Sequence, residues 1–266
     1  MLSLIWSEEE VRRFISLLPD LGEYEGYMVM LIARSRIVKE LFGIKIKDTP
    51  VEFKIVPWYY ENWREKLLRV VRKLAVLGAH SRELYTIRGS GREVEPPPEA
   101  MGIMLVINPL NLKRALYQFM RDTLQLIMEM NDWKQAIRVT SRWYGTAHAC
   151  ARKVFHTIDV ETKDEKLIST LLHILDKYSQ PFAMIETRRG YHILIDLRRF
   201  SEDNVLATRY WREFLQRELP ELQREFRFRD EKGEEKLLIE YIKHIQEPVP
   251  GTLYGGFPVR LVKVFK

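Results

Sequence analysis

The chain has 266 residues, of which 46% are hydrophobic and 30% are Asp, Glu, Lys or Arg. This composition allows a sizeable core and excludes an intrinsically disordered chain. The net charge of +6 suits a nucleic-acid or nucleotide partner. The one cysteine, Cys150, excludes a disulfide framework or a zinc–cysteine site and favours a reducing, cytoplasmic setting. The N-terminal apolar run is too short for a signal peptide, and no stretch reaches membrane-spanning length, so no membrane partner is expected.

The N-terminal half is expected to form a lobe of helices and strands. A capping box at residues 7–10 predicts a short helix over residues 11–18. Residues 24–42 carry apolar side chains at helical spacing and predict a second helix. Arg34 and Arg36 fall on this helix and are interpreted as part of its solvated face.

Four further segments of this lobe have recognisable patterns. Residues 44–56 alternate as strands or a hairpin would, and residues 61–77 predict an amphipathic helix. Residues 102–107 form a continuous apolar run, which is typical of a buried strand. Residues 112–130 predict a helix whose apolar stripe is expected to be core.

The C-terminal half predicts a second lobe with its own order of elements. They follow as strand, helix, strand, strand, helix, strand over residues 154–160, 164–178, 182–186, 191–197, 201–219 and 236–242. This order is the ferredoxin-like pattern, which nucleic-acid recognition folds and polymerase palms share. The expected fold class is α+β, with an N-terminal α/β lobe at residues 1–150 packed on a lobe at residues 151–266 in one compact unit.

Two carboxylates, Asp159 and Glu161, stand at the end of the predicted strand 154–160. Side chains at positions i and i+2 of a strand share a face, so these two acids repel each other unless a cation lies between them. A divalent ion with oxygen ligands would remove that repulsion. The alternative interpretation is an ordinary solvated strand end, where Asp and Glu are common.

Two later stretches place polar residues beside apolar strands. One is a basic turn with a glycine and a histidine, and the other is a loop rich in Pro and Gly. Together with Asp159 and Glu161, they resemble the ordered motifs of the archaeo-eukaryotic primase superfamily, the small catalytic primase subunits and the primase-polymerases. The matching stretches are Ile158-Asp159-Val160-Glu161, Arg189-Gly190-Tyr191-His192, Ile239-Glu240 and Pro250-Gly251-Thr252-Leu253-Tyr254-Gly255.

This resemblance implies a two-lobed primase-like fold whose catalytic lobe is ferredoxin-like, as in RNA-recognition domains. It also implies a metal-dependent polymerase that synthesises DNA or RNA on a template. Mg²⁺ or Mn²⁺ would be held by Asp159, Glu161 and a third acid. Glu240 is the first choice for that acid, Glu247 the second and Asp196 the third.

The resemblance further implies a set of nucleotide-binding residues. His192 corresponds to the histidine that contacts the phosphates of the incoming nucleotide. Tyr254 stands where the family commonly has a histidine, so Arg260, Lys263 or His244 would have to supply the missing positive charge. The whole predicted set is Thr187, Arg188, Arg189, Gly190, His192, Tyr254 and Arg260.

The implied partners are single-stranded DNA or a primer-template, nucleoside triphosphates, and a helicase or large primase subunit. The last is expected because the chain lacks the cysteines of the family's zinc-binding insertion. Gly190 would let its turn approach a ligand closely. Three alternatives stay open: a repair-type, end-joining polymerase of the same superfamily, a nucleic-acid-binding protein that has lost catalysis, and an unrelated ferredoxin-like regulatory protein.

Overall fold

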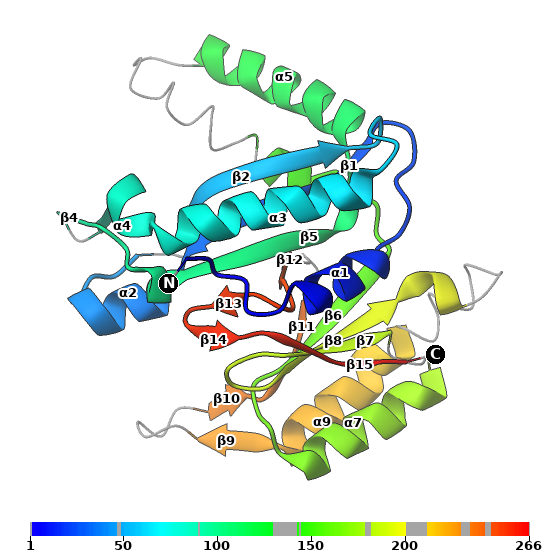
Figure 1. Cartoon of the computed structure of the whole chain (residues 1–266). Helices are drawn as coiled ribbons and strands as arrows, with labels where there is room; N and C mark the ends of the chain where they lie inside the picture. Colours follow the sequence, from blue (N-terminus) through cyan, green and yellow to red (C-terminus); the bar gives the residue numbers. More distant parts are fainter. Residues whose placement is uncertain are drawn as a thin grey trace.

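Two larger antiparallel sheets and the helices that cover them form most of the molecule (Figure 1). The computed structural model describes residues 2–46, 49–89, 91–129, 143, 145–178, 182–200, 212–229, 235–242 and 246–265. The chain is therefore of mixed α and β structure, as the sequence predicts. No helix in these ranges is long and apolar enough to cross a membrane.

The first sheet has the strand order β14-β13-β5-β1-β2, and β12 also pairs with β5. Its strands are β1 Glu25–Ala33, β2 Thr49–Pro57, β5 Met101–Asn111, β12 Gln246–Pro248, β13 Leu253–Tyr254 and β14 Phe257–Pro258. The central strand β1 is buried along its whole length and β5 along nearly all of its length. A strand covered on both faces needs apolar side chains at every position, which explains their continuous apolar runs.

The predicted helix over residues 24–42 is wrong in its first half. Residues Glu25–Ala33 form β1, and only Ser35–Phe42 form a helix, α2. A run of nine buried residues satisfies helical spacing and strand spacing equally well, so periodicity alone cannot separate the two. The helix does end as expected, because Gly43 adopts the left-handed conformation that caps α2 (φ 68°).

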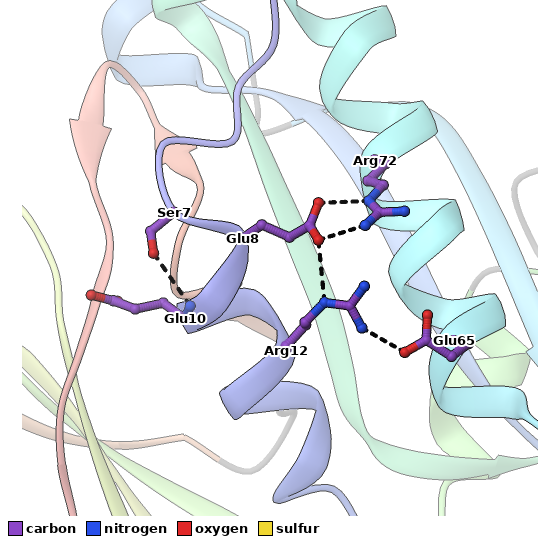
Figure 2. A network of polar contacts seen from close by, with 6 residues as sticks. All are labelled: Ser7, Glu8, Glu10, Arg12, Glu65 and Arg72. Atoms are coloured by element: carbon purple, nitrogen blue, oxygen red, sulfur yellow. Dashed lines mark hydrogen bonds and ion pairs between the residues drawn. The ribbon is translucent and has the colours of Figure 1, made fainter.

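Helices α1 Glu8–Ser16 and α3 Trp63–Ala79 pack on one face of the first sheet. The predicted cap of α1 is present, because the Ser7 hydroxyl accepts a hydrogen bond from the Glu10 amide at 3.3 Å. Figure 2 shows how the two helices are joined: the Glu8 carboxylate accepts hydrogen bonds from Arg72 of α3 and from Arg12. Arg12 in turn bonds Glu65 at 2.5 Å.

Helix α5, Leu112–Glu129, lies at the far end of the first sheet, away from the second (Figure 1). The expectation that its apolar stripe is core is wrong. Its exposed apolar side chains are Leu116, Tyr117, Met120, Leu124, Ile127 and Met128. After α5, residues 130–142 and 144 lie outside the described part of the chain.

The second sheet has the strand order β11-β6-β8-β7-β15. Its strands are β6 Phe155–Val160, β7 Ala183–Glu186, β8 Tyr191–Asp196, β11 Ile239–Ile242 and β15 Arg260–Val264. Helices α7 Glu165–Tyr178 and α9 Leu219–Glu225 cover one face. The order strand, helix, strand, strand, helix, strand is therefore present, with β8 inserted between β6 and β7.

The helix before β11 runs further than the sequence predicts. Pro220 was expected to end it, but a π-helical turn at Phe214–Glu218 continues into α9, where Pro220 occupies the first turn. Inside a continuing helix proline removes one i→i−4 hydrogen bond, and the π-helical turn Phe214–Glu218 lies directly before α9. Residues 201–211 of the predicted helix are outside the described ranges.

The remaining elements are short. They are α4 Ser81–Leu84, β3 Ile87–Gly89, β4 Arg92–Val94, the 3-10 turns Pro98–Ala100 and Leu197–Phe200, β9 Arg227–Arg229 and β10 Glu235–Leu237.

The two sheets do not divide at residue 150 as predicted. Strands β12, β13 and β14 come from the C-terminal half, yet they belong to the first sheet. Residues of the second sheet, such as Phe155, Ile185 and Leu194, share one continuous core with the first sheet and its helices. The C-terminal half therefore contributes to both layers, and the site described below lies where they meet.

Candidate active site

The predicted acidic residues and histidine lie in one row across three strands of the second sheet. In β6, Asp159 stands directly opposite Glu240 of β11 on one side and His192 of β8 on the other. Directly opposed residues of antiparallel strands project from the same face, with Cβ atoms about 5 Å apart. The face of this row is the one not covered by α7 and α9, because the neighbouring positions Ile158, Ile193 and Ile239 point into that helical core.

The two carboxylates of the Asp-x-Glu pair each face a positive group. Glu161 forms an ion pair with Arg189 at 3.0 Å, and Asp159 lies 3.5 Å from Nε2 of His192. Burial, which is the largest cause, and the negative charges of Glu161, Glu247 and Glu240 together raise the pKa of Asp159 to about 6 against the opposing effect of His192. The charged form of Asp159 is therefore disfavoured both by lost hydration and by neighbouring acids.

The imidazole of His192 contacts a buried glutamate of the first sheet. Its Nδ1 lies 2.6 Å from the carboxylate of Glu247, a residue of β12 that is only 1% exposed. Burial by itself lowers the pKa of His192, but the charges of Glu247 and Asp159 outweigh burial and raise it to about 9. The imidazole is therefore positively charged at neutral pH.

The other two candidates for a third acid are not placed at the row. The oxygens of Glu247 are taken by His192 and by the Thr157 hydroxyl, which donates at 2.5 Å. Asp196 is buried at the far end of β8, opposite Phe155, where both of its oxygens bond Arg198. Glu240, the first choice, is the one that stands beside Asp159.

An open cleft of about 540 Å³ lies over Asp159 and His192, and Glu240 is not among the residues that line it. It brings together seven of the predicted site residues: Asp159, Glu161, Thr187, Arg188, Arg189, His192 and Tyr254. It is also lined by Gly255 of the Pro-Gly loop and by residues that are not in the predicted site, namely Arg34, Arg36, Ile37, Met104, Ile242 and Gln246. Positive charge thus lines both walls, from α2 in one layer and from the β7–β8 turn in the other.

Arg34 corrects two expectations. Its guanidinium lies 4.0 Å from the centre of the Tyr254 ring and donates a hydrogen bond to the Tyr254 hydroxyl, so it is not part of a solvated helix face. It also places positive charge beside Tyr254, where Arg260 or Lys263 was expected to do so. The mistaken helix over residues 24–42 concealed this position, because Arg34 is in fact the residue that joins β1 to α2.

Arg260 and Lys263 do not reach the cleft. Both belong to β15, the edge strand farthest from β11, and neither lines the cleft. Arg260 lies over the ring of Trp6 and Lys263 over that of Phe265. His244 lies outside the described residues.

The backbone at Gly190 and Gly102 explains how the cleft walls approach each other. A Cβ atom at Gly190 would lie 1.8 Å from the carbonyl oxygen of Val160, so the contact between the turn and β6 requires glycine at this position. A Cβ atom at Gly102 would lie 2.3 Å from the Tyr254 ring. Gly190 allows the turn that carries Arg188 and Arg189 to lie against β6, and Gly102 leaves space for the ring of Tyr254.

The donor set fits a hard divalent cation by its chemistry, because carboxylate oxygens are the ligands that Mg²⁺ and Mn²⁺ prefer. A bound cation would also offset the negative charges of Glu161, Glu247 and Glu240, which add to the effect of burial on the pKa of Asp159. Within the described ranges, no three His, Cys, Asp or Glu side chains are gathered closely enough to hold a metal ion together. In this arrangement Arg189 and His192 provide the positive charges that face the acids.

No family model, no curated protein and no solved structure matches this chain.

Proposed function

We propose that the chain is a metal-dependent nucleotidyltransferase that synthesises nucleic acid on a single-stranded DNA template, as a primase or primase-polymerase does. The observation that carries the proposal is the row of Glu240, Asp159 and His192 on neighbouring strands, with Glu161 directly after the end of β6. The row lies on the face of the second sheet that is turned toward the first sheet, in a part of the chain with the ferredoxin-like order of elements, which is common among polymerase palms. Motifs far apart in the sequence thus meet at one place.

Asp159, Glu161 and Glu240 would hold Mg²⁺ or Mn²⁺, and to do so their side chains would have to come closer together than they are in the structure. Such ions lower the pKa of an attacking hydroxyl and neutralise the leaving pyrophosphate. The raised pKa of Asp159, about 6, still leaves this carboxylate mostly ionised and able to bind a cation at neutral pH. Nucleotidyl transfer asks for little covalent chemistry from the protein, so positioning and charge are the main tasks of the other residues.

The triphosphate would bind between the two positively charged walls. Arg188 and Arg189 come from the β7–β8 turn, and Arg34 and Arg36 from the start of α2. One guanidinium group can donate two parallel hydrogen bonds to phosphate oxygens, and it keeps its charge at every physiological pH. His192, positively charged through its contact with Glu247, would contact a phosphate from the floor of the cleft.

Nucleotide incorporation on single-stranded DNA tests the proposal, with and without a primer and with either Mg²⁺ or Mn²⁺. We expect products that disappear in the Asp159→Ala, Glu161→Ala double variant. Products without a primer would identify a primase, and products only with a primer would favour the repair-type polymerase. No product under any condition would refute polymerase activity for this chain alone.

A second candidate is a nucleic-acid-binding protein without catalysis. The observation that favours it is that both acids of the Asp-x-Glu pair already face positive groups, Arg189 and His192. In that case, single-stranded DNA would bind equally well to the wild type and to the double variant, and neither would incorporate nucleotides. The same set of proteins therefore separates the two candidates.

A further inference from the structure

Glu247 connects the two sheets at the centre of the molecule. It belongs to β12, which pairs with the central strand β5 of the first sheet, where Glu247 stands opposite Leu105. Its carboxylate crosses to the second sheet, where it accepts hydrogen bonds from Thr157 of β6 and from His192 of β8, at 2.5 and 2.6 Å. The side chain is almost completely buried, so these two groups are its main compensation for lost hydration.

This contact determines how the imidazole of His192 is presented. Because Nδ1 donates its proton to Glu247, Nε2 is the nitrogen left for other partners. Nε2 faces Asp159 at 3.5 Å, on the side of the cleft. A histidine without such a partner could rotate and could adopt either neutral tautomer.

We propose that Glu247 is a positioning residue: from the first sheet it holds the His192 imidazole so that Nε2 faces Asp159 and the phosphates of a bound nucleoside triphosphate. This inference rests on the proposed function and assigns Glu247 a role other than that of a metal ligand. The anchor is firm, because the next residues continue the attachment to β5: Pro248 pairs with Met104, and the Val249 amide donates to Ile103.

The segment that contains Glu247 also contributes Tyr254 to the opposite wall of the cleft. The chain runs from Glu247 through a tight turn at Gly251 to Tyr254, whose ring Arg34 contacts. The same segment therefore positions the floor of the cleft through His192 and one wall through Tyr254. A triphosphate that spans the floor and the wall would contact groups placed by one rigid segment.

Four variants test the inference: Glu247→Gln, His192→Asn, the double variant, and Thr157→Val as the matched control. Thr157→Val removes the other hydrogen bond of Glu247 and leaves the one to His192 in place. We measure Kd for a non-hydrolysable nucleoside triphosphate, kcat and KM for incorporation, and the low-field proton resonance of an Nδ1–H group bonded to a carboxylate.

We expect Glu247→Gln to remove the low-field resonance and to weaken triphosphate binding by about 10- to 100-fold, the range typical of residues that orient a functional histidine. The double variant should bind no more weakly than His192→Asn alone, because the two side chains act as a unit. Thr157→Val should lower Tm but keep the resonance and the wild-type Kd.

Additive losses in the double variant, or wild-type Kd in Glu247→Gln together with a lowered Tm, would show that Glu247 is only structural and would overturn the inference. If the wild type neither binds nor incorporates nucleotides, the proposed function fails, and the phosphate-directed role of Glu247 fails with it. The resonance reports separately whether Glu247 holds the imidazole, so the two failures are distinguishable.

Discussion

Asp159 is the carboxylate whose environment opposes its charge most clearly. Its pKa is raised from 3.8 to about 6 by burial and by neighbouring acids. The folded state therefore binds a proton that the unfolded state releases in this range, and stability falls as the pH rises from about 4 to 6. Such a cost is common where a site is built for a ligand and not for stability.

Replacing Asp159 with Asn should therefore stabilise the protein above pH 6. At 1.36 kcal/mol for each pKa unit, the gain is at most about 3 kcal/mol. It should disappear below about pH 4, where the wild-type carboxyl is protonated in both states. Urea unfolding at pH 4 and pH 7.5 measures the difference, and a variant less stable than the wild type at pH 7.5 would contradict this account of the site.

His192 also makes the stability depend on pH, in a higher range, because the fold stabilises its charged form. Its pKa is raised from 6.5 to about 9, so the imidazolium stabilises the fold fully below pH 6.5 and this contribution is lost as the pH rises through 9. We expect the wild type to lose up to about 3 kcal/mol between these values, on the same conversion. The loss should be absent in His192→Asn and retained in His173→Asn, which changes an exposed histidine of α7. Equal pH profiles for all three proteins would refute it.

The contact of the β7–β8 turn with β6 leads to a prediction about elements. Gly190→Ala would force a Cβ atom to within 1.8 Å of a backbone oxygen, which cannot move without breaking the β6–β8 pairing. Such overpacking costs about 1–3 kcal/mol or more. Gly145→Ala is the control, because its Cβ would meet nothing within 4 Å and it lies in a helical turn, where Ala is favoured over Gly. Chemical denaturation of both variants tests this, and equal stabilities would contradict it.

The elements of the second sheet could be predicted because their strands are short and bounded by turn residues. The apolar run before Asp159 predicts a strand. The Arg-Arg-Gly sequence before His192 predicts a turn that leads into another strand, and both strands are present. By contrast, the sequence predicts a helix where β1 lies, because nine consecutive buried residues have no period that favours either structure. The apolar stripe of α5 predicted core, yet burial depends on which surface lies opposite, and the sequence of one helix does not contain that information.

The candidate site could be predicted only where its residues lie in recognisable motifs. Asp159, Glu161 and His192 are brought together as expected. Arg34 could not be found, because its role depends on the packing of α2 against the loop that contains Tyr254. The pairing of Glu247 with His192 could not be found either, since it requires β12 to join a sheet built mainly by the other half of the chain.

At the level of the whole molecule, the site lies between the two sheets. Its carboxylates repel one another, and a bound cation would reduce that repulsion. A ligand that binds only the folded state raises its stability by mass action. We therefore expect Mn²⁺ to raise Tm of the wild type, by an amount that increases with its concentration. The Asp159→Ala, Glu161→Ala double variant should show no such increase. An equal increase in both proteins would place the bound metal elsewhere.

The central claim is that the row of Glu240, Asp159 and His192 catalyses nucleotidyl transfer. The most direct test is single-turnover incorporation of one nucleotide on a primed single-stranded template with Mn²⁺, comparing the wild type, Asp159→Asn and Asp164→Asn. Asp164→Asn makes the same chemical change at a helix cap, where Asn serves as well as Asp. The account predicts incorporation by the wild type and Asp164→Asn and none by the folded Asp159→Asn. Incorporation by Asp159→Asn at the wild-type rate would contradict it.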